Sequence, residues 1–144
     1  MLEGKTGICA KDIMTDEVIV IYEDMTVRDA AHLMLRNRVS GFPVINKGVG
    51  LVGVITMTDL FRLVHKASIN GDEAFNEQIH NTQNMPVAHL MSRNVVTIKP
   101  ETTLHEMIHI LVNQKIHLFP VMDDKRIVGI VSRHDILNAI FAYI

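Results

Sequence analysis

Two short polar motifs in this chain carry residue types that can bind a sugar and a phosphate. Residues 56–59 read Thr-Met-Thr-Asp and residues 132–135 read Ser-Arg-His-Asp, each between an apolar run and a stretch with helical periodicity. A helix N-terminus attracts phosphate through unpaired N–H groups and the positive end of its dipole. A hydroxyl there adds a hydrogen-bond donor, and an Asp one turn later can accept hydrogen bonds from both hydroxyls of a ribose. With the apolar strands nearby, the motifs indicate nucleotide pockets.

The same motifs also have a purely structural interpretation. A Ser or Thr that caps a helix, followed by a carboxylate at the third helical position, is a variant of the capping box. Two copies at matching places favour a binding role, but a duplication copies caps as faithfully as sites. On the motifs alone, both interpretations stay open.

The motifs belong to an internal repeat that covers most of the chain. Residues 12–15, 39–44 and 53–59 recur as residues 89–92, 116–121 and 129–135, respectively. Met14 and Met91 are 77 positions apart, whereas Asp59 and Asp135 are 76 apart, so one residue is lost between the matched stretches. The loss falls in the Gly-bearing segment 46–50, where a turn can absorb it. Two half-size copies predict a pseudo-symmetric body with two related clefts.

Each copy is expected to form a strand, a helix, two strands and a second helix. The connector at 67–86 is polar and long for a compact domain, with one or two helical turns around 74–79. It could be a lid, a partner contact or a mobile segment. The expected elements are 18–21, 26–38, 42–45, 51–56 and 57–64 in the first copy, and 95–98, 103–113, 119–122, 127–132 and 133–143 in the second.

Composition narrows the functional classes. The 144 residues are enough for one ordinary domain, and 48% hydrophobic content indicates a globular chain. A net charge of −2 provides no basic field for nucleic acid, and a single cysteine excludes an internal disulfide framework. The apolar runs are too short to span a membrane, and residues 1–5 do not resemble a signal peptide. We therefore expect a cytoplasmic protein without nucleic-acid binding or membrane insertion.

The ordered set of motifs resembles the cystathionine-β-synthase (CBS) domain, in the pair often called a Bateman module. The resemblance is carried by a Met-Thr or Met-Ser start, a Phe-Pro-Val strand and a Gly-apolar-apolar-Thr/Ser-x-x-Asp end, each present twice. It implies an α/β (α+β) fold, a tandem pair of β-α-β-β-α repeats related by a pseudo-twofold axis. Repeat 1 would span 8–66, the connector 67–86 and repeat 2 87–144, together one compact module of a stand-alone CBS-domain protein.

The resemblance also implies a function. Such modules bind AMP, ADP, ATP or S-adenosylmethionine in clefts between the repeats, without catalysis and without a required cofactor. Occupancy would be transmitted to the mate in a homodimer, or to a regulated enzyme or transporter in trans. The expected function is therefore regulatory sensing of an adenosine-containing ligand.

Each implied cleft draws on both repeats. The first cleft would combine Thr15, Ile19, Val39, Ser40 and Gly41 with Ser132, Arg133, His134 and Asp135. The second cleft would combine Ser92, Val96, Ile116, His117 and Leu118 with Thr56, Thr58 and Asp59.

The two clefts should differ in charge. Arg133 and His134 can offer positive charge to a phosphate, whereas Met57 and Thr58 at the equivalent positions are neutral. His117 could compensate in the second cleft, but Leu118 stands where some family members carry Arg. We expect the first cleft to bind a charged adenine nucleotide more tightly.

One further motif suggests an enzyme. Residues 105–109 match the H-E-x-x-H pattern of zinc hydrolases, with His105 and His109 on one helix face. Glu106, however, fits a capping box with Thr103, and no third ligand is evident. We expect neither a catalytic residue nor a metal site, although zinc binding without catalysis stays open. A nucleotide hydrolase is disfavoured by the lack of a Walker A loop, and a scaffold with empty clefts is the remaining alternative.

Overall fold

The computed structural model describes residues 7–142 and divides the chain into two compact units. We call Met1–Val18 together with Val96–Ile144 the terminal unit, and Ile19–Val95 the middle unit. The expected end of the last helix at residue 143 and the expected boundary at 144 lie outside the described residues.

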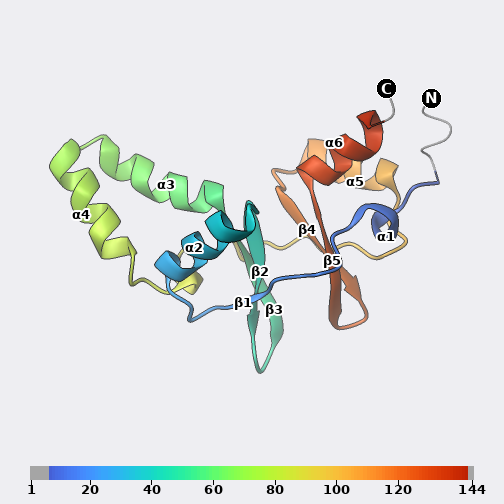
Figure 1. Ribbon diagram of the computed structural model, residues 1–144, viewed down its shortest axis with the longest axis horizontal. Helices are drawn as coiled ribbons and strands as arrows, with labels where there is room; N and C mark the ends of the chain where they lie inside the picture. Colours follow the sequence, from blue (N-terminus) through green and yellow to red (C-terminus); the bar gives the residue numbers. More distant parts are fainter. Residues whose placement is uncertain (1–6, 143–144) are drawn as a thin grey trace. The chain divides into compact units, whose positions relative to one another are not determined.

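The middle unit is built on a three-stranded sheet of order β1-β2-β3 (Figure 1). β1 (Ile21–Tyr22) runs parallel to β2 (Gly41–Asn46), and β2 runs antiparallel to β3 (Gly50–Thr56). The helix α2 (Val27–Asn37) is capped by Thr26, whose side chain accepts a hydrogen bond from the Asp29 N–H at 3.2 Å. Ala30 and Met34, two of the apolar positions that predicted α2, face a buried core, whereas Leu35 is 71% exposed. Ile21, Ala30, Met34, Phe42, Val44, Ile55, Val87 and Met91 form that core.

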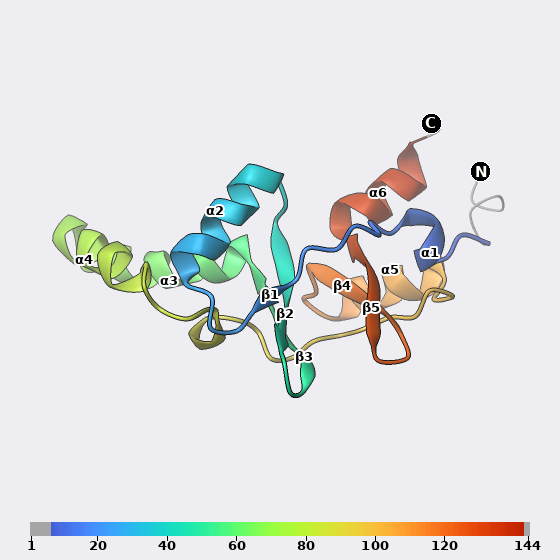
Figure 2. The same cartoon turned by 60° about the horizontal axis from the view of Figure 1, so that its bottom comes forward.

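The connector holds more helix than the sequence predicted. α3 runs from Met57 to Ser68, four residues beyond the expected end, and α4 (Asp72–Thr82) replaces the expected one or two turns. The two helices lie side by side as a hairpin in both views (Figures 1 and 2). Gly71, at φ 97°, makes the turn between them, a conformation that L side chains rarely adopt. A 3₁₀ helix, Val87–His89, follows.

The terminal unit repeats this plan around β4 (Leu118–Asp123) and β5 (Arg126–Ser132), which pair antiparallel. Its helices are α1 (Ala10–Ile13), α5 (Leu104–Asn113) and α6 (Arg133–Phe141). Its core contains Ala10, Ile98, Leu104, Met107, Ile116, Phe119, Val121, Val131 and Ile136.

Proline explains why the first strand of each repeat is shorter than expected. Ile98 donates to the Pro120 carbonyl at 3.0 Å and accepts from the Met122 N–H at 2.8 Å. Pro120 has no N–H to donate further upstream, so the parallel pairing stops there and 95–98 is no strand. In the middle unit β1 begins at Ile21, paired with Val44, the residue after the equivalent Pro43.

The opening segment of each repeat packs on the sheet of the other repeat. Thr15 exchanges two 2.9 Å backbone hydrogen bonds with Ile130, and Ser92 exchanges two with Val54, also at 2.9 Å. A methionine side chain packs against a glycine beside each bridge. An added Cβ on Gly53 would lie 2.6 Å from the Met91 Sδ. An added Cβ on Gly129 would likewise meet the side chain of Met14. We call residues 7–18 and 87–95 the arms. The compact units and the sequence repeats therefore do not coincide.

The Asp12 carboxylate in the first arm should make the stability of the protein depend on pH. Hydrogen bonds from the Cys9 backbone N–H (2.9 Å) and thiol (3.2 Å) lower the pKa of Asp12 from its ordinary 3.8. A lowered folded-state pKa means that the carboxylate stabilises α1 fully above about pH 3.8, and that this is lost as pH falls through the lowered value. We expect Asp12→Asn to reduce Tm at pH 7 and the reduction to shrink at pH 3. A reduction that is the same at both pH values would contradict this role.

Candidate functional site

Asp135 sits one turn into α6, directly after β5. The Asp135 N–H donates to the Ser132 Oγ at 3.2 Å, and the Ser132 N–H and hydroxyl donate to the Asp135 Oδ2 at 2.8 and 2.9 Å. This is the capping box that the sequence allowed. Asp135 is half-buried, and among residues 7–142 no hydrogen bond or ion pair reaches its Oδ1. One carboxylate oxygen thus holds the helix start, and the other is available to a ligand.

Asp59 has the same place in the middle unit, with one difference. Its Oδ2 accepts from the Thr56 N–H at 2.8 Å and the Thr56 hydroxyl at 3.2 Å. Its Oδ1 lies 3.9 Å from Nη1 of Arg62, one turn further along α3. The Asp59 side chain is 10% exposed and that of Arg62 is 69% exposed. The equivalent of Arg62 in α6 is Asn138, so only the Asp59 carboxylate has this cation.

Sequence reasoning missed Arg62. The available signal was an Arg three residues after Asp on the same helix, a spacing at which side chains meet. Its absence from the equivalent position in α6 would also have indicated that the two carboxylates differ.

The middle unit places the loop before β2 against the start of α3. The Met57 N–H donates to the Ser40 carbonyl at 2.8 Å, and Gly41 pairs with Thr56. An added Cβ on Gly41 would lie 2.6 Å from the Ile55 carbonyl oxygen, so the close approach needs glycine. Ile19 and Val39 pack against the same core.

The terminal unit has a comparable contact. Arg133 is exposed, and its Nε donates to the Ile116 carbonyl at 3.2 Å, while Leu118 pairs with Ser132. Ile116 and Leu118 are themselves buried, so their side chains serve the core.

Each unit therefore contains residues expected for both clefts. The middle unit holds Ile19, Val39, Ser40 and Gly41 of the first cleft and Thr56, Thr58, Asp59 and Ser92 of the second. The terminal unit holds Thr15, Ser132, Arg133, His134 and Asp135 of the first cleft and Val96, Ile116, His117 and Leu118 of the second. The membership of each complete cleft stays a prediction.

The H-E-x-x-H helix is α5, and its glutamate has the predicted structural role. Glu106 Oε2 accepts from the Thr103 N–H at 3.1 Å, and the Thr103 hydroxyl accepts from the Glu106 N–H at 3.1 Å. In the described part of the chain, no cluster of three or more His, Cys, Asp or Glu side chains could hold a metal ion. Likewise, none of the described helices has the length and apolar character needed to cross a membrane.

Comparison with known proteins gives consistent matches over most of the chain. The CBS domain family model matches residues 10–66 and 87–142. The chain is 32% identical to the uncharacterized protein MJ1426 of Methanocaldococcus jannaschii, over 90% of this chain and 89% of that protein. Three other curated relatives are longer, and the chain spans 45%, 23% and 14% of their lengths.

Solved structures show the same fold. The structure of CBSX2 in complex with AMP is 27% identical, with a TM-score of 0.73, and the match covers 94% of this chain and 98% of that one. The CBS domain pair of protein MJ0100, in complex with 5′-methylthioadenosine and S-adenosyl-L-methionine, has a TM-score of 0.77 at 22% identity. That match covers 94% of this chain and 97% of the other.

Proposed function

Because the chain belongs to the CBS domain family, as a tandem pair of repeats, we propose that it is a regulatory module that binds an adenosine-containing ligand. The observation that carries the proposal is Asp135, whose Oδ2 holds the helix cap while Oδ1 takes part in no hydrogen bond or ion pair within residues 7–142. That oxygen can accept a hydrogen bond from a ribose hydroxyl. The AMP bound to CBSX2 supports the ligand class. The proposal assigns no reaction to the chain.

The start of α6 favours a phosphate-bearing ligand. Arg133 and His134 are both exposed, and only the Nε of the Arg133 guanidinium donates a hydrogen bond to the Ile116 carbonyl. A charge-assisted hydrogen bond from guanidinium to phosphate is stronger than a neutral one. At the start of α3 the equivalent residues are Met57 and Thr58, which carry no charge. The first of the two predicted clefts is therefore proposed as the tighter nucleotide site.

A ligand screen tests the function directly. We expect AMP, ADP, ATP or S-adenosylmethionine to raise the Tm of the purified chain, since a ligand that binds only the folded state stabilises it by mass action. Calorimetric titration would then give Kd and stoichiometry, with GMP as the control for the base. If none of these compounds shifts Tm or produces heat, the chain is better described as a scaffold.

Arg133→Ala should separate phosphate binding from nucleoside binding. Loss of one hydrogen bond to a charged group costs about 1.5–3 kcal/mol, so AMP affinity should fall roughly tenfold or more, while adenosine affinity stays unchanged. Arg126→Ala is the matched control, because Arg126 is also exposed but lies at the opposite end of β5. Equal losses for AMP and adenosine would remove Arg133 from the phosphate site.

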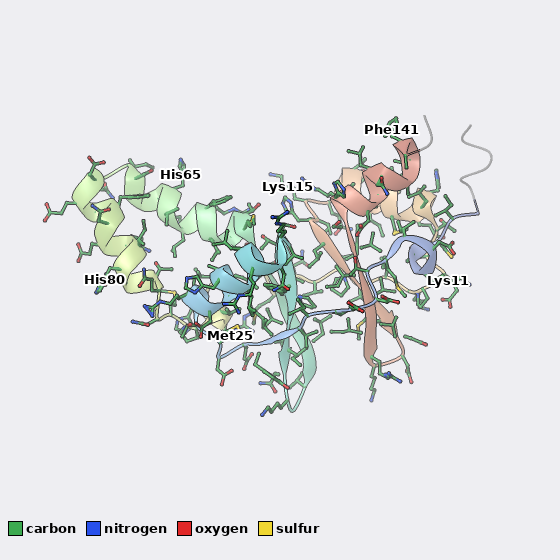
Figure 3. The ribbon with its side chains drawn as sticks, viewed as in Figure 1. Lys11, Met25, His65, His80, Lys115 and Phe141 are labelled. Carbon is green, nitrogen blue, oxygen red and sulfur yellow. The ribbon has the colours of Figure 1, made fainter. Side chains whose placement is uncertain are left out.

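We also propose that the module is a homodimer that transmits occupancy to its mate or to a regulated enzyme or transporter. Phe61 on α3 and Leu137 on α6 occupy equivalent positions and are 64% and 57% exposed. Phe141, on the last turn of α6 (Figure 3), is 55% exposed. Large exposed apolar side chains on matching helices favour burial against another chain. The ligand can shift the assembly only through differential affinity for its states.

Leu137→Glu should therefore dissociate the dimer. A charge placed in a desolvated contact between chains is costly, so light scattering after size exclusion should give a monomer mass. Val112→Glu is the control, since Val112 is 77% exposed but lies on α5. A wild-type chain that is already monomeric would contradict the dimer without affecting ligand binding.

A further inference from the structure

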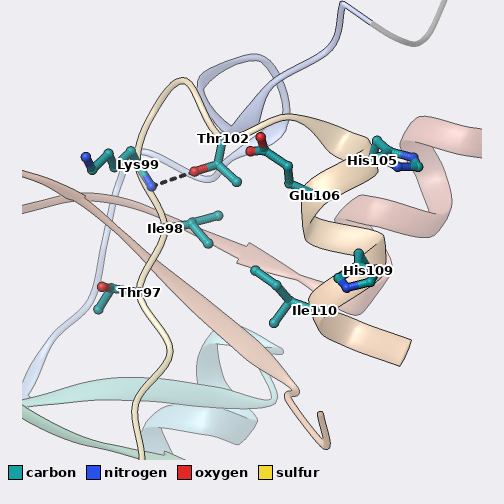
Figure 4. Close-up of a pocket in the computed structure, with 8 residues that line it drawn as sticks. All are labelled: Thr97, Ile98, Lys99, Thr102, His105, Glu106, His109 and Ile110. Carbon is teal, nitrogen blue, oxygen red and sulfur yellow. Dashed lines mark hydrogen bonds between the residues drawn. The ribbon is translucent and has the colours of Figure 1, made fainter. Parts of the chain in front are cut away.

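The helix α5 presents two imidazoles on one face. His105 and His109 lie one turn apart on the same side of α5, whereas Glu106 points toward Thr102 (Figure 4). Both histidines are exposed, and within residues 7–142 neither imidazole takes part in a hydrogen bond or ion pair. They are therefore available to an added ligand at no cost in lost internal contacts.

The spacing suits bidentate binding of a metal ion. Side chains at i and i+4 on a helix have Cβ atoms about 5–6 Å apart, and imidazole nitrogen binds Zn²⁺ at roughly 2.0–2.1 Å. The helix is held in place by its capping box and by the buried Leu104 and Met107 on the opposite face. The two ligands thus stand on a rigid element rather than on a loop.

The surroundings limit the site to these two protein ligands. His105, His109 and Glu106 line an open pocket of about 440 Å³ with Ile98, Ile110 and Lys99. Glu106 Oε2 is used by the Thr103 N–H, and the described residues provide no cluster of three ligand-type side chains. Water would complete the coordination, and the glutamate is not placed to act as a base on it.

We propose that His105 and His109 form a two-ligand site for a divalent transition-metal ion that stabilises α5 without catalysis. Imidazole ligands suit Zn²⁺, Ni²⁺ and Cu²⁺, and affinity for such a site should rank Cu²⁺ above Ni²⁺ and Zn²⁺. This site lies outside the residues proposed for the nucleotide, and it does not depend on the proposed function.

The first repeat supplies an internal control. Arg28 and His32 on α2 stand where α5 has His105 and His109, so α2 offers a single imidazole. The middle unit should therefore bind no metal in the same way. Arg28→His would create a second pair at the same spacing.

The test is titration of the metal-free chain with ZnCl₂ and NiCl₂, followed by calorimetry and amide hydrogen exchange. We expect one ion per chain and slower exchange in α5 but not in α2. His105→Asn and His109→Asn should each weaken binding at least about tenfold, the lower end of what loss of even an outer-shell partner costs. Glu106→Gln should leave metal affinity unchanged, and Arg28→His should raise the stoichiometry to two.

Either of two outcomes would overturn the proposal. One is the absence of binding by the wild-type chain at millimolar metal. The other is binding that survives in both single-histidine variants, which would place the ion elsewhere. A loss of affinity in Glu106→Gln would show that three ligands are involved and would also contradict the two-ligand site.

Discussion

Asp135→Ala is expected to weaken AMP binding by about ten- to a hundredfold, and to do so more than Asp59→Ala. Each substitution removes a carboxylate that could accept ribose hydroxyls, but the two carboxylates start from different states. Asp59 Oδ1 already has the Arg62 guanidinium 3.9 Å away, whereas no ion pair reaches Asp135 Oδ1 from any residue between 7 and 142. A ribose at Asp59 must compete with that cation, so Asp59 contributes less to AMP affinity and Asp59→Ala should reduce that affinity less.

This experiment needs a control for stability, because both aspartates also cap helices. Glu106→Ala removes the same kind of capping box in α5, outside the proposed nucleotide residues. It should lower Tm by a similar amount, since the loss of a cap costs about 0.5–2 kcal/mol, and leave the Kd for AMP unchanged. Titration at a temperature well below every Tm then isolates binding. Equal losses in the two aspartate variants would contradict the inequality of the sites.

Arg62→Ala extends the comparison. If the guanidinium competes for Asp59, its removal should strengthen binding at that site, and Asn138→Arg should weaken binding at Asp135. Opposite changes would mean that Arg62 contacts the ligand directly.

Gly53→Ala is expected to destabilise the protein by about 1–3 kcal/mol, as overpacking does. The new Cβ would lie 2.6 Å from the Met91 Sδ and 2.9 Å from the Ser92 carbonyl oxygen, so the second arm must shift. Gly129→Ala meets three atoms that all belong to the Met14 side chain. The first clash involves backbone, whereas the second involves only a flexible side chain.

A double-mutant cycle distinguishes the two positions. Met14→Ala should recover most of the loss caused by Gly129→Ala, whereas Met91→Ala should recover less of that caused by Gly53→Ala, because the Ser92 carbonyl remains. Urea denaturation gives the free energies of unfolding. Gly48→Ala is the control, because its Cβ would have only an ordinary 3.4 Å contact with the Asn46 side chain. Additive losses in both pairs would mean that the arms do not pack as described.

Local patterns predicted most of the elements, and the family match confirms the α/β fold of paired repeats. Helical periodicity and Thr caps located α2 and α5 to within a residue or two of each end. The expected strand at 18–21 is instead Ile21–Tyr22, and the expected strand at 95–98 is absent. A run of β-branched residues does not show whether the neighbouring strand has the backbone N–H groups to pair with it. Pro43 and Pro120 were in view, but their effect depends on which strand lies beside them.

The sequence pattern did not predict how the carboxylate oxygens of the caps are used or which residues meet across the fold. The capping boxes at Asp59 and Asp135 were predicted as one of two interpretations, and the structure shows that a cap uses only one carboxylate oxygen. The contact of Arg133 with Ile116 joins residues 17 positions apart that the sequence had placed in different clefts. The packing of each arm on the other repeat's sheet has no local signature, apart from the matched Met and Gly positions.

The pairing of Thr15 with Ile130 has a consequence for synthesis on the ribosome. The middle unit is contiguous, so its sheet, helices and second arm can assemble once residue 95 has left the exit tunnel. The terminal unit needs both the earliest described segment and β5, and closing so long a loop carries an entropic cost. During translation the first arm therefore stays unpaired after the middle unit has folded, until β4 and β5 emerge and pair with it.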